Sequence, residues 1–98
     1  MAATRRAHSV TYTDDALDDL DGIAEHYAMR EAWDAAIDVP DRIRAAVPLI
    51  GHQPEGWPIG LSGHRERVLS DLPFRIAYDV SATQVIILRI KHTKQQWP

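Results

Sequence analysis

The sequence predicts an α+β fold in which a helical hairpin packs on one face of a twisted antiparallel sheet. A short segment of alternating polarity comes first, and two stretches with apolar residues at helical spacing follow it. Three strand-like segments joined by short turns close the chain. Because short turns join antiparallel neighbours, the expected order is β-α-α-β-β-β. A chain of 98 residues is expected to form a single domain, 1–98.

The first strand and the first helix are expected at 8–13 and 14–29. The segment HSVTYT is rich in β-branched and aromatic residues, as in a short strand. Thr13 then occupies an N-cap position, and Asp14 and Asp15 face the positive end of the helix dipole. The helix itself is predicted by apolar residues at steps of three and four, namely Ala16, Leu17, Leu20, Ile23, Ala24 and Tyr27.

A second helix is expected over 31–50. Its apolar positions are Trp33, Ala36, Ile37, Ile43, Ala46, Val47 and Ile50. Pro40 removes a backbone donor, so the helix either kinks there or restarts with Asp38 as its cap. Pro48 predicts that the last turn is irregular as well.

A loop is expected over 51–63, which is rich in proline and glycine, and three strands follow at 65–70, 74–80 and 84–92. The last strand is the most apolar and is expected to be central in the sheet. Alternation places Phe74, Ile76, Tyr78 and Val80 against the helices. In the last strand, Ile86, Leu88 and Ile90 share a face, and Val85 and Ile87 form a second apolar set opposite them.

This alternation predicts a cluster of Arg65, Arg67, Arg75 and Arg89 on the sheet face away from the helices, with His92 at its edge. Guanidinium groups bind phosphate or carboxylate oxygens in a bidentate way, so an RNA, a DNA or an acidic peptide are candidate ligands. The alternative is solvated arginines paired with Glu66 and Asp79. His92 is a candidate general acid or base, or a structural residue at a strand end.

Charge is unevenly distributed along the chain, although the net charge is only −3. Ten carboxylates and a single arginine lie between Asp14 and Asp41, whereas 42–98 carries four acids and eight bases. Such a division indicates two surfaces with different partners, or an acidic helix face that keeps the protein soluble. The sequence has no cysteine, no apolar run of membrane-spanning length and no ligand spacing among its histidines. The expectation is a cytoplasmic protein without metal or cofactor.

Three segments resemble the RelE/ParE toxin superfamily. Tyr12–Thr13 leading into the first helix is similar to the opening of these toxins, and 74–78 (FRIAY) resembles their YR-I/L-x-Y strand. The stretch 85–92 (VIILRIKH) resembles their last strand, which often ends in histidine. The resemblance implies the toxin of a bacterial type II toxin–antitoxin system, held in a hetero-oligomer by its cognate antitoxin.

The superfamily divides by target into RelE-like nucleases, which cleave mRNA on the ribosome, and ParE-like inhibitors of DNA gyrase. If the chain is a nuclease, the resemblance implies that its catalytic residues are Arg75 in the YR strand, Arg65 and Arg67 in the preceding strand, and His92. The C-terminal tyrosine of the nuclease branch is missing, and Trp97 cannot donate a proton in its place. The negative net charge also disfavours a polyanionic target.

The sequence therefore favours a ParE-like gyrase inhibitor that is not an enzyme, with the ribonuclease as the alternative. Target or antitoxin binding is expected at the basic and aromatic residues Arg65, Arg67, Arg75, Arg89, Lys91 and Trp97. An exposed strand at 65–70 would suit addition of an antitoxin strand, and a helix–sheet groove would suit an antitoxin helix.

Overall fold

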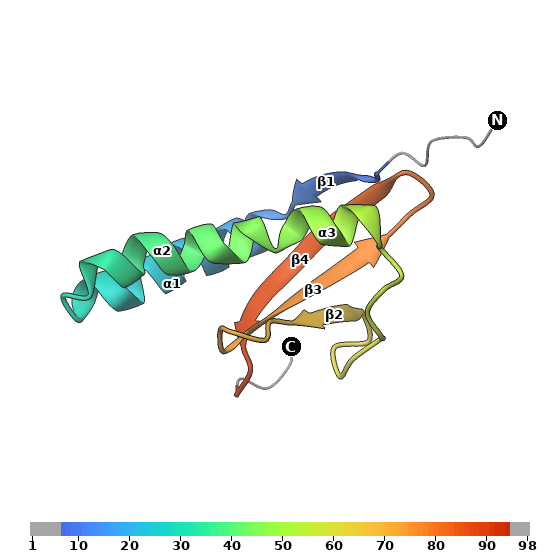
Figure 1. The fold of residues 1–98 in the computed structure, drawn as a ribbon. Helices are drawn as coiled ribbons and strands as arrows, with labels where there is room; N and C mark the ends of the chain where they lie inside the picture. The colour runs from blue at the N-terminus through green and yellow to red at the C-terminus, as the bar shows by residue number, and fades with distance from the viewer. Residues whose placement is uncertain (1–6, 95–98) are drawn as a thin grey trace.

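A computed structural model describes residues 7–94 and confirms the α+β class. The elements are β1 (Ser9–Tyr12), α1 (Asp14–Met29), α2 (Trp33–Ala45), α3 (Val47–His52), β2 (Arg65–Val68), β3 (Phe74–Val80) and β4 (Gln84–His92). Figure 1 shows α1 and α2 as a hairpin that projects past the sheet, while α3 lies over the sheet. The hairpin is therefore anchored at one end only.

The four strands form one sheet in the order β1-β4-β3-β2. The pairs β2–β3 and β3–β4 are antiparallel, as their short turns predict, and β4 is central. β1 differs from the expected antiparallel arrangement, because it pairs in parallel with β4. A tight turn dictates the direction of the next strand, but β1 reaches β4 only through the helices and two other strands. Its direction is therefore set by the tertiary fold.

Helix α1 has the predicted bounds and the predicted cap. The Thr13 hydroxyl oxygen accepts a hydrogen bond from the Ala16 N–H at 3.1 Å. The same hydroxyl donates to the Leu88 carbonyl oxygen at 2.8 Å. One side chain thus starts the helix and attaches it to the central strand.

The expected second helix is divided into α2 and α3, and the break lies at Ala46 rather than at Pro40. Pro40 is inside α2, where it is buried. Pro48 has no N–H to donate to the Arg44 carbonyl, so the helical ladder is interrupted just before it. In α3 the same proline occupies the first turn, where a missing donor costs little.

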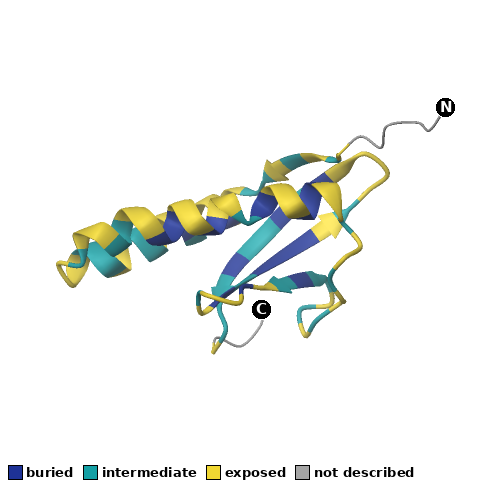
Figure 2. Ribbon diagram, in the orientation of Figure 1, coloured by how far each residue is buried: buried dark blue, intermediate teal, exposed yellow. Residues whose placement is uncertain are grey.

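The start of α2 does not bury the residues that the apolar pattern indicated. Trp33 is 62% exposed and Ile37 is 70% exposed, whereas Val39, Pro40 and Ile43 are buried. Figure 2 shows that buried residues are confined to the part of the hairpin near the sheet. Between 21 and 38 no residue is buried. Trp33 and Ile37 are apolar positions of the predicted helix, yet they stay exposed because the hairpin extends beyond the sheet that would cover them.

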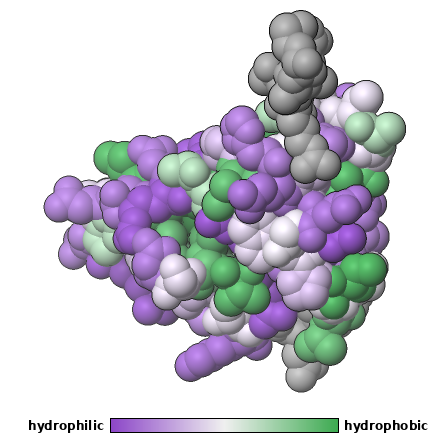
Figure 3. Space-filling view, turned by 45° about the vertical axis from the view of Figure 1, so that its right-hand side comes forward, coloured by the Kyte–Doolittle hydropathy of each residue, from purple (hydrophilic) through white to green (hydrophobic). Residues whose placement is uncertain are grey.

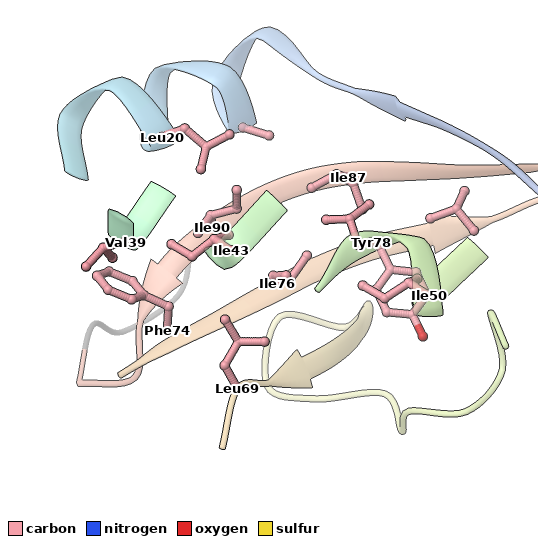
Figure 4. Packing of buried hydrophobic residues seen from close by; sticks show 13 residues of the cluster. Leu20, Val39, Ile43, Ile50, Leu69, Phe74, Ile76, Tyr78, Ile87 and Ile90 are labelled. Carbon is pink, nitrogen blue, oxygen red and sulfur yellow. The ribbon is translucent and has the colours of Figure 1, made fainter. Parts of the chain in front are cut away.

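The core fills the space between the helices and one face of the sheet. Figure 4 shows Val39 and Ile43 over the Phe74 end of this face and Ile50 near Tyr78 at the other end. Tyr78 is fully buried, and its hydroxyl donates to the Pro54 carbonyl oxygen at 2.7 Å. Burial raises the pKa of Tyr78, so the phenol stays protonated and keeps this bond.

A β-bulge decides which side chains of β4 face the core. Tyr78 pairs with Ile87 and Ala77 with Arg89, so Leu88 is left as an extra residue. Val85, Ile87 and Ile90 are buried, whereas Ile86 and Leu88 are only half-buried and lie on the opposite face. The prediction that Ile86, Leu88 and Ile90 share one face is therefore wrong, since the extra residue reverses the alternation within the strand.

Candidate functional site

Strand register places the first two candidate arginines on the helix side of the sheet. Arg65 is paired with Tyr78 and Arg67 with Ile76, and directly paired residues share a face. Tyr78 and Ile76 are core residues. Arg65 and Arg67 therefore lie on the face opposite to the predicted one, because alternation sorts residues into two sets without saying which set faces the core.

Both side chains are held by main-chain carbonyl groups. The Arg65 guanidinium donates to the Trp57 carbonyl oxygen at 2.7 Å. Arg67 donates to the Ala46 carbonyl oxygen at the helix break, and its guanidinium carbon lies 4.7 Å from the centre of the Trp57 ring. These two arginines fasten the loop around Trp57 and the end of α2 to the edge of the sheet.

Arg75 lies on the face away from the helices, as predicted, but it is paired with a buried carboxylate. Its Nη1 donates to Glu66 Oε1 at 3.2 Å, and its Nη2 donates to the Thr93 carbonyl oxygen. Glu66 is 5% exposed and accepts two more hydrogen bonds, from the Ser62 N–H at 2.9 Å and the Ser62 hydroxyl at 2.8 Å. Burial alone would raise the pKa of Glu66, but Ser62 and Arg75 outweigh it and the pKa is lowered.

Arg89 is engaged by α1. Its Nε and Nη2 donate to the two oxygens of Asp19 at 2.8 and 3.0 Å, and the Ile90 N–H donates to the same carboxylate at 2.8 Å. The bond to Asp19 raises the pKa of Arg89. The predicted four-arginine cluster is thus not formed, and each guanidinium has an intramolecular acceptor. The pairing of Arg75 with Glu66 that the sequence left open is present, whereas Asp79 pairs with His64 at 2.5 Å.

His92 and Lys91 point to opposite faces of the sheet. His92 is paired with Phe74 on the core side, and the two rings meet edge to face at 5.5 Å. Its Nδ1 accepts a hydrogen bond from the Lys94 N–H at 3.1 Å. Lys91 is paired with Arg75 on the other face. Trp97 lies outside the described residues.

The face away from the helices carries a hollow instead of a basic cluster. It has a volume of about 460 Å³ and lies between the start of α1, the loop before β2 and the sheet. Its lining is Thr13, Asp15, Leu61, Ser62, His64, Ala77, Leu88 and Arg89. We call this the far-face groove. Leu61 is 88% exposed and Leu88 half-buried, so an apolar side chain of a partner could be covered there between charged neighbours.

A second groove runs between α1 and the end of β4. It is lined by Asp18, Asp19, Gly22, Ile23, His26, Tyr27, Phe74, Ile90, Lys91 and His92. It corresponds to the helix–sheet groove that the sequence predicted as a site for an antitoxin helix. Figure 3 shows apolar surface as separate patches among polar side chains, in keeping with several small contact regions rather than a single broad one.

Two residues that organise the groove region, Asp19 and Ser62, were not predicted from the sequence, and Glu66 was predicted only as a possible partner of the arginines. Asp19 was counted only as part of the acidic helix, and Ser62 only as part of a loop. The one available signal was Glu66 itself, a carboxylate between two arginines in a strand. Because Glu66 alternates with Arg65 and Arg67, the sequence places it on the opposite face of the strand. The sequence does not show that the loop at Ser62 folds over that face.

Within residues 7–94, no group of three or more histidine, aspartate or glutamate side chains is placed to hold a metal ion. None of the helices in that range has the length and apolar character needed to cross a membrane.

Comparison with known proteins identifies the family. Residues 10–97 match the ParE_toxin family, described as the ParE toxin of the type II toxin-antitoxin system parDE. The chain is 39% identical over 90 residues to "Putative toxin Y4kP" of Sinorhizobium fredii strain NGR234, covering 91% of this chain and 92% of that one. A solved structure titled "Chromosomal ParDE TA system from P. aeruginosa" superposes with a TM-score of 0.77 at 27% identity, covering 88% of this chain and 96% of that one. The chain belongs to the ParE family of type II toxins, within the RelE/ParE superfamily.

Proposed function

We propose that this ParE-family toxin inhibits growth by poisoning DNA gyrase and that a cognate antitoxin neutralises it. Family membership supports the gyrase target over mRNA cleavage. The choice of gyrase over mRNA rests on the separation of the candidate nuclease residues, which lie on two different faces of the sheet. Arg65, Arg67 and His92 lie on the helix side of the sheet, and Arg75 lies on the other side, bound to Glu66. A scissile phosphate could not meet all four groups at once.

We further propose that the antitoxin binds the far-face groove with an amphipathic segment. The solved relative belongs to a ParDE system, in which a toxin is paired with an antitoxin. In this chain the groove offers Leu61 and Leu88 to apolar side chains and Arg89 and His64 to polar ones. An antitoxin segment with an apolar stripe and a few carboxylates would match this lining.

The test is induction of the protein in growing bacteria, alone and together with the product of its neighbouring gene. The expected result is growth arrest with DNA breaks and induction of the DNA-damage response, while transcripts stay intact and the neighbouring product restores growth. Purified protein should inhibit supercoiling by gyrase. Transcripts cut on the ribosome, with cutting lost in His92→Gln, would instead establish the ribonuclease. Arg75→Ala is unsuitable for this purpose, since it leaves the buried Glu66 without its partner.

The antitoxin site is tested separately with Leu61→Asp, which places a charge in the groove at a residue that the core does not need. Toxicity should persist while rescue by the antitoxin weakens. Val68→Asp is the matched control, because Val68 is also exposed, at 57%, but does not line the groove. Equal rescue of the two variants would place the antitoxin elsewhere.

A further inference from the structure

The free end of the helical hairpin exposes large apolar side chains. Met29, the last residue of α1, is 78% exposed, and Trp33 and Ile37 of α2 are 62% and 70% exposed. Trp33 and Ile37 are four residues apart, so they lie on the same side of the helix. Trp57, by contrast, is covered by Arg67. We call Met29, Trp33 and Ile37 the hairpin-tip patch.

The exposure of these residues does not result from a poorly amphipathic helix. The same helix buries Val39, Pro40 and Ile43 where it passes over the sheet. The tip lies beyond the sheet (Figure 1), and 21–38 contains no buried residue. Exposed aromatic and aliphatic residues that share one side of a helix, as Trp33 and Ile37 do, favour a contact site, and tryptophan is among the residues most enriched at the centre of such contacts.

The charges around the patch specify the chemistry of the partner. Glu25, Glu31 and Asp34 are all exposed and lie within about one helical turn of Met29 or Trp33. Arg30 is the single base between Asp14 and Asp41, against ten carboxylates. A second copy of this chain would bring two acidic rims together, and an acidic segment would meet the same repulsion. A basic partner would be attracted.

We propose that the hairpin-tip patch is a docking surface for a basic amphipathic helix of a partner protein. The apolar stripe of that helix covers Trp33 and Ile37, and its lysines or arginines face the carboxylates of the rim. This surface is separate from the far-face groove, so it does not depend on where the antitoxin binds or on which target the toxin has.

The test uses two synthetic helical peptides with the same leucine stripe, one with lysine and one with glutamate on its polar face. The lysine peptide should bind the intact protein and shift backbone amide resonances within 24–41, and the glutamate peptide should leave the resonances of 24–41 unchanged. Trp33→Ala with Ile37→Ala should weaken binding at least about tenfold. Glu31→Gln with Asp34→Asn should weaken it and reduce its dependence on salt.

Val68→Ala is the matched control, because it removes an apolar side chain that is 57% exposed and lies outside the patch and both grooves. It should leave the affinity unchanged, and thermal melts of all variants should show an intact fold. Three results would overturn the proposal. These are peptide binding that survives loss of Trp33 and Ile37, amide shifts spread over the whole acidic face of α1, or a dimer of the protein that dissociates when Trp33 is replaced.

Discussion

At the scale of single residues, the sheet arginines of this toxin stabilise the fold of the protein. Arg67 holds the break between α2 and α3, Arg75 neutralises Glu66, and Arg89 ties β4 to Asp19 of α1. The pair of Glu66 and Arg75 is the most enclosed of these, with side chains 5% and 17% exposed. A buried charge is costly without its partner, so stability should be sensitive to each member of this pair.

Replacement of Glu66 by glutamine should destabilise the protein in a pH-dependent way. The pKa of Glu66 is lower in the folded than in the unfolded chain, so its stabilising contribution is present above the unfolded pKa and is lost as the pH falls through the folded one. We expect Glu66→Gln to lower the free energy of unfolding by about 1–3 kcal/mol at pH 7. The difference should shrink progressively below about pH 4. Denaturant unfolding of both proteins from pH 3 to 7 measures it, and a constant difference would contradict the assignment.

Replacement by alanine should change the free energy of unfolding in opposite directions at two glycines, Gly60 and Gly22. A Cβ at Gly60 would lie 2.1 Å from the Glu66 carboxylate oxygen, so the loop or the buried pair must move. We expect Gly60→Ala to cost about 1–3 kcal/mol. Gly22 is the control, because a Cβ there meets nothing within 4 Å. Gly22→Ala in the middle of α1 should stabilise by about 0.5–1 kcal/mol. Chemical denaturation compares them, and equal effects would show that the loop does not pack on Glu66 as described.

At the scale of elements, the hairpin α1–α2 is joined by a turn with an unusual residue. Glu31 has a φ of 58°, in the left-handed region, and follows the C-cap Arg30. The Ala32 N–H donates back to the Tyr27 carbonyl at 2.9 Å, which closes the turn. Glycine is usual at this position, since it has no Cβ to clash. The chain keeps a carboxylate there, beside the hairpin-tip patch.

Replacing Glu31 by glycine should therefore stabilise the protein by about 1 kcal/mol, through relief of the left-handed strain. Glu31→Ala separates conformation from charge, because alanine removes the carboxylate but keeps the Cβ. We expect Glu31→Ala to change the melting temperature little and Glu31→Gly to raise it. A rise of equal size in both would attribute the effect to charge repulsion within the acidic hairpin instead.

At the scale of the whole molecule, stability is concentrated at one end. The core lies between α3, the sheet-proximal turns of α1 and α2, and the face of β3 and β4 that carries Tyr78 and Ile87. The hairpin extends beyond the sheet, and 21–38 contains no buried residue. The sheet and the tip should therefore open independently.

Amide hydrogen exchange followed by nuclear magnetic resonance tests this division. The slowest amides should be those of β3 and β4, with protection close to the global free energy of unfolding. Amides from about 26 to 35 should exchange fastest among the helical residues. The lysine peptide should protect these amides selectively if it binds the hairpin-tip patch. Uniform protection along both helices would show that the hairpin is a single cooperative unit with the sheet.

The sequence by itself determined most of the elements and the family. Apolar spacing and the Thr13 cap located α1 to the residue, and the turns at 71–73 and 81–83 located β3 and β4, because local periodicity and turn chemistry depend on near neighbours. Family resemblance was carried by the FRIAY strand and the last strand, and it is confirmed.

Tertiary structure alone decided which face each arginine occupies and which apolar residues are buried. The bulge at Leu88 reverses alternation within β4, and strand register turns Arg65 and Arg67 toward the helices. Trp33 and Ile37 have core-like spacing, yet the sheet ends before it reaches them. These outcomes depend on contacts between residues far apart in the chain. A one-residue shift in pairing exchanges the two faces of a strand without changing its pattern of residues, so no local pattern could have revealed them.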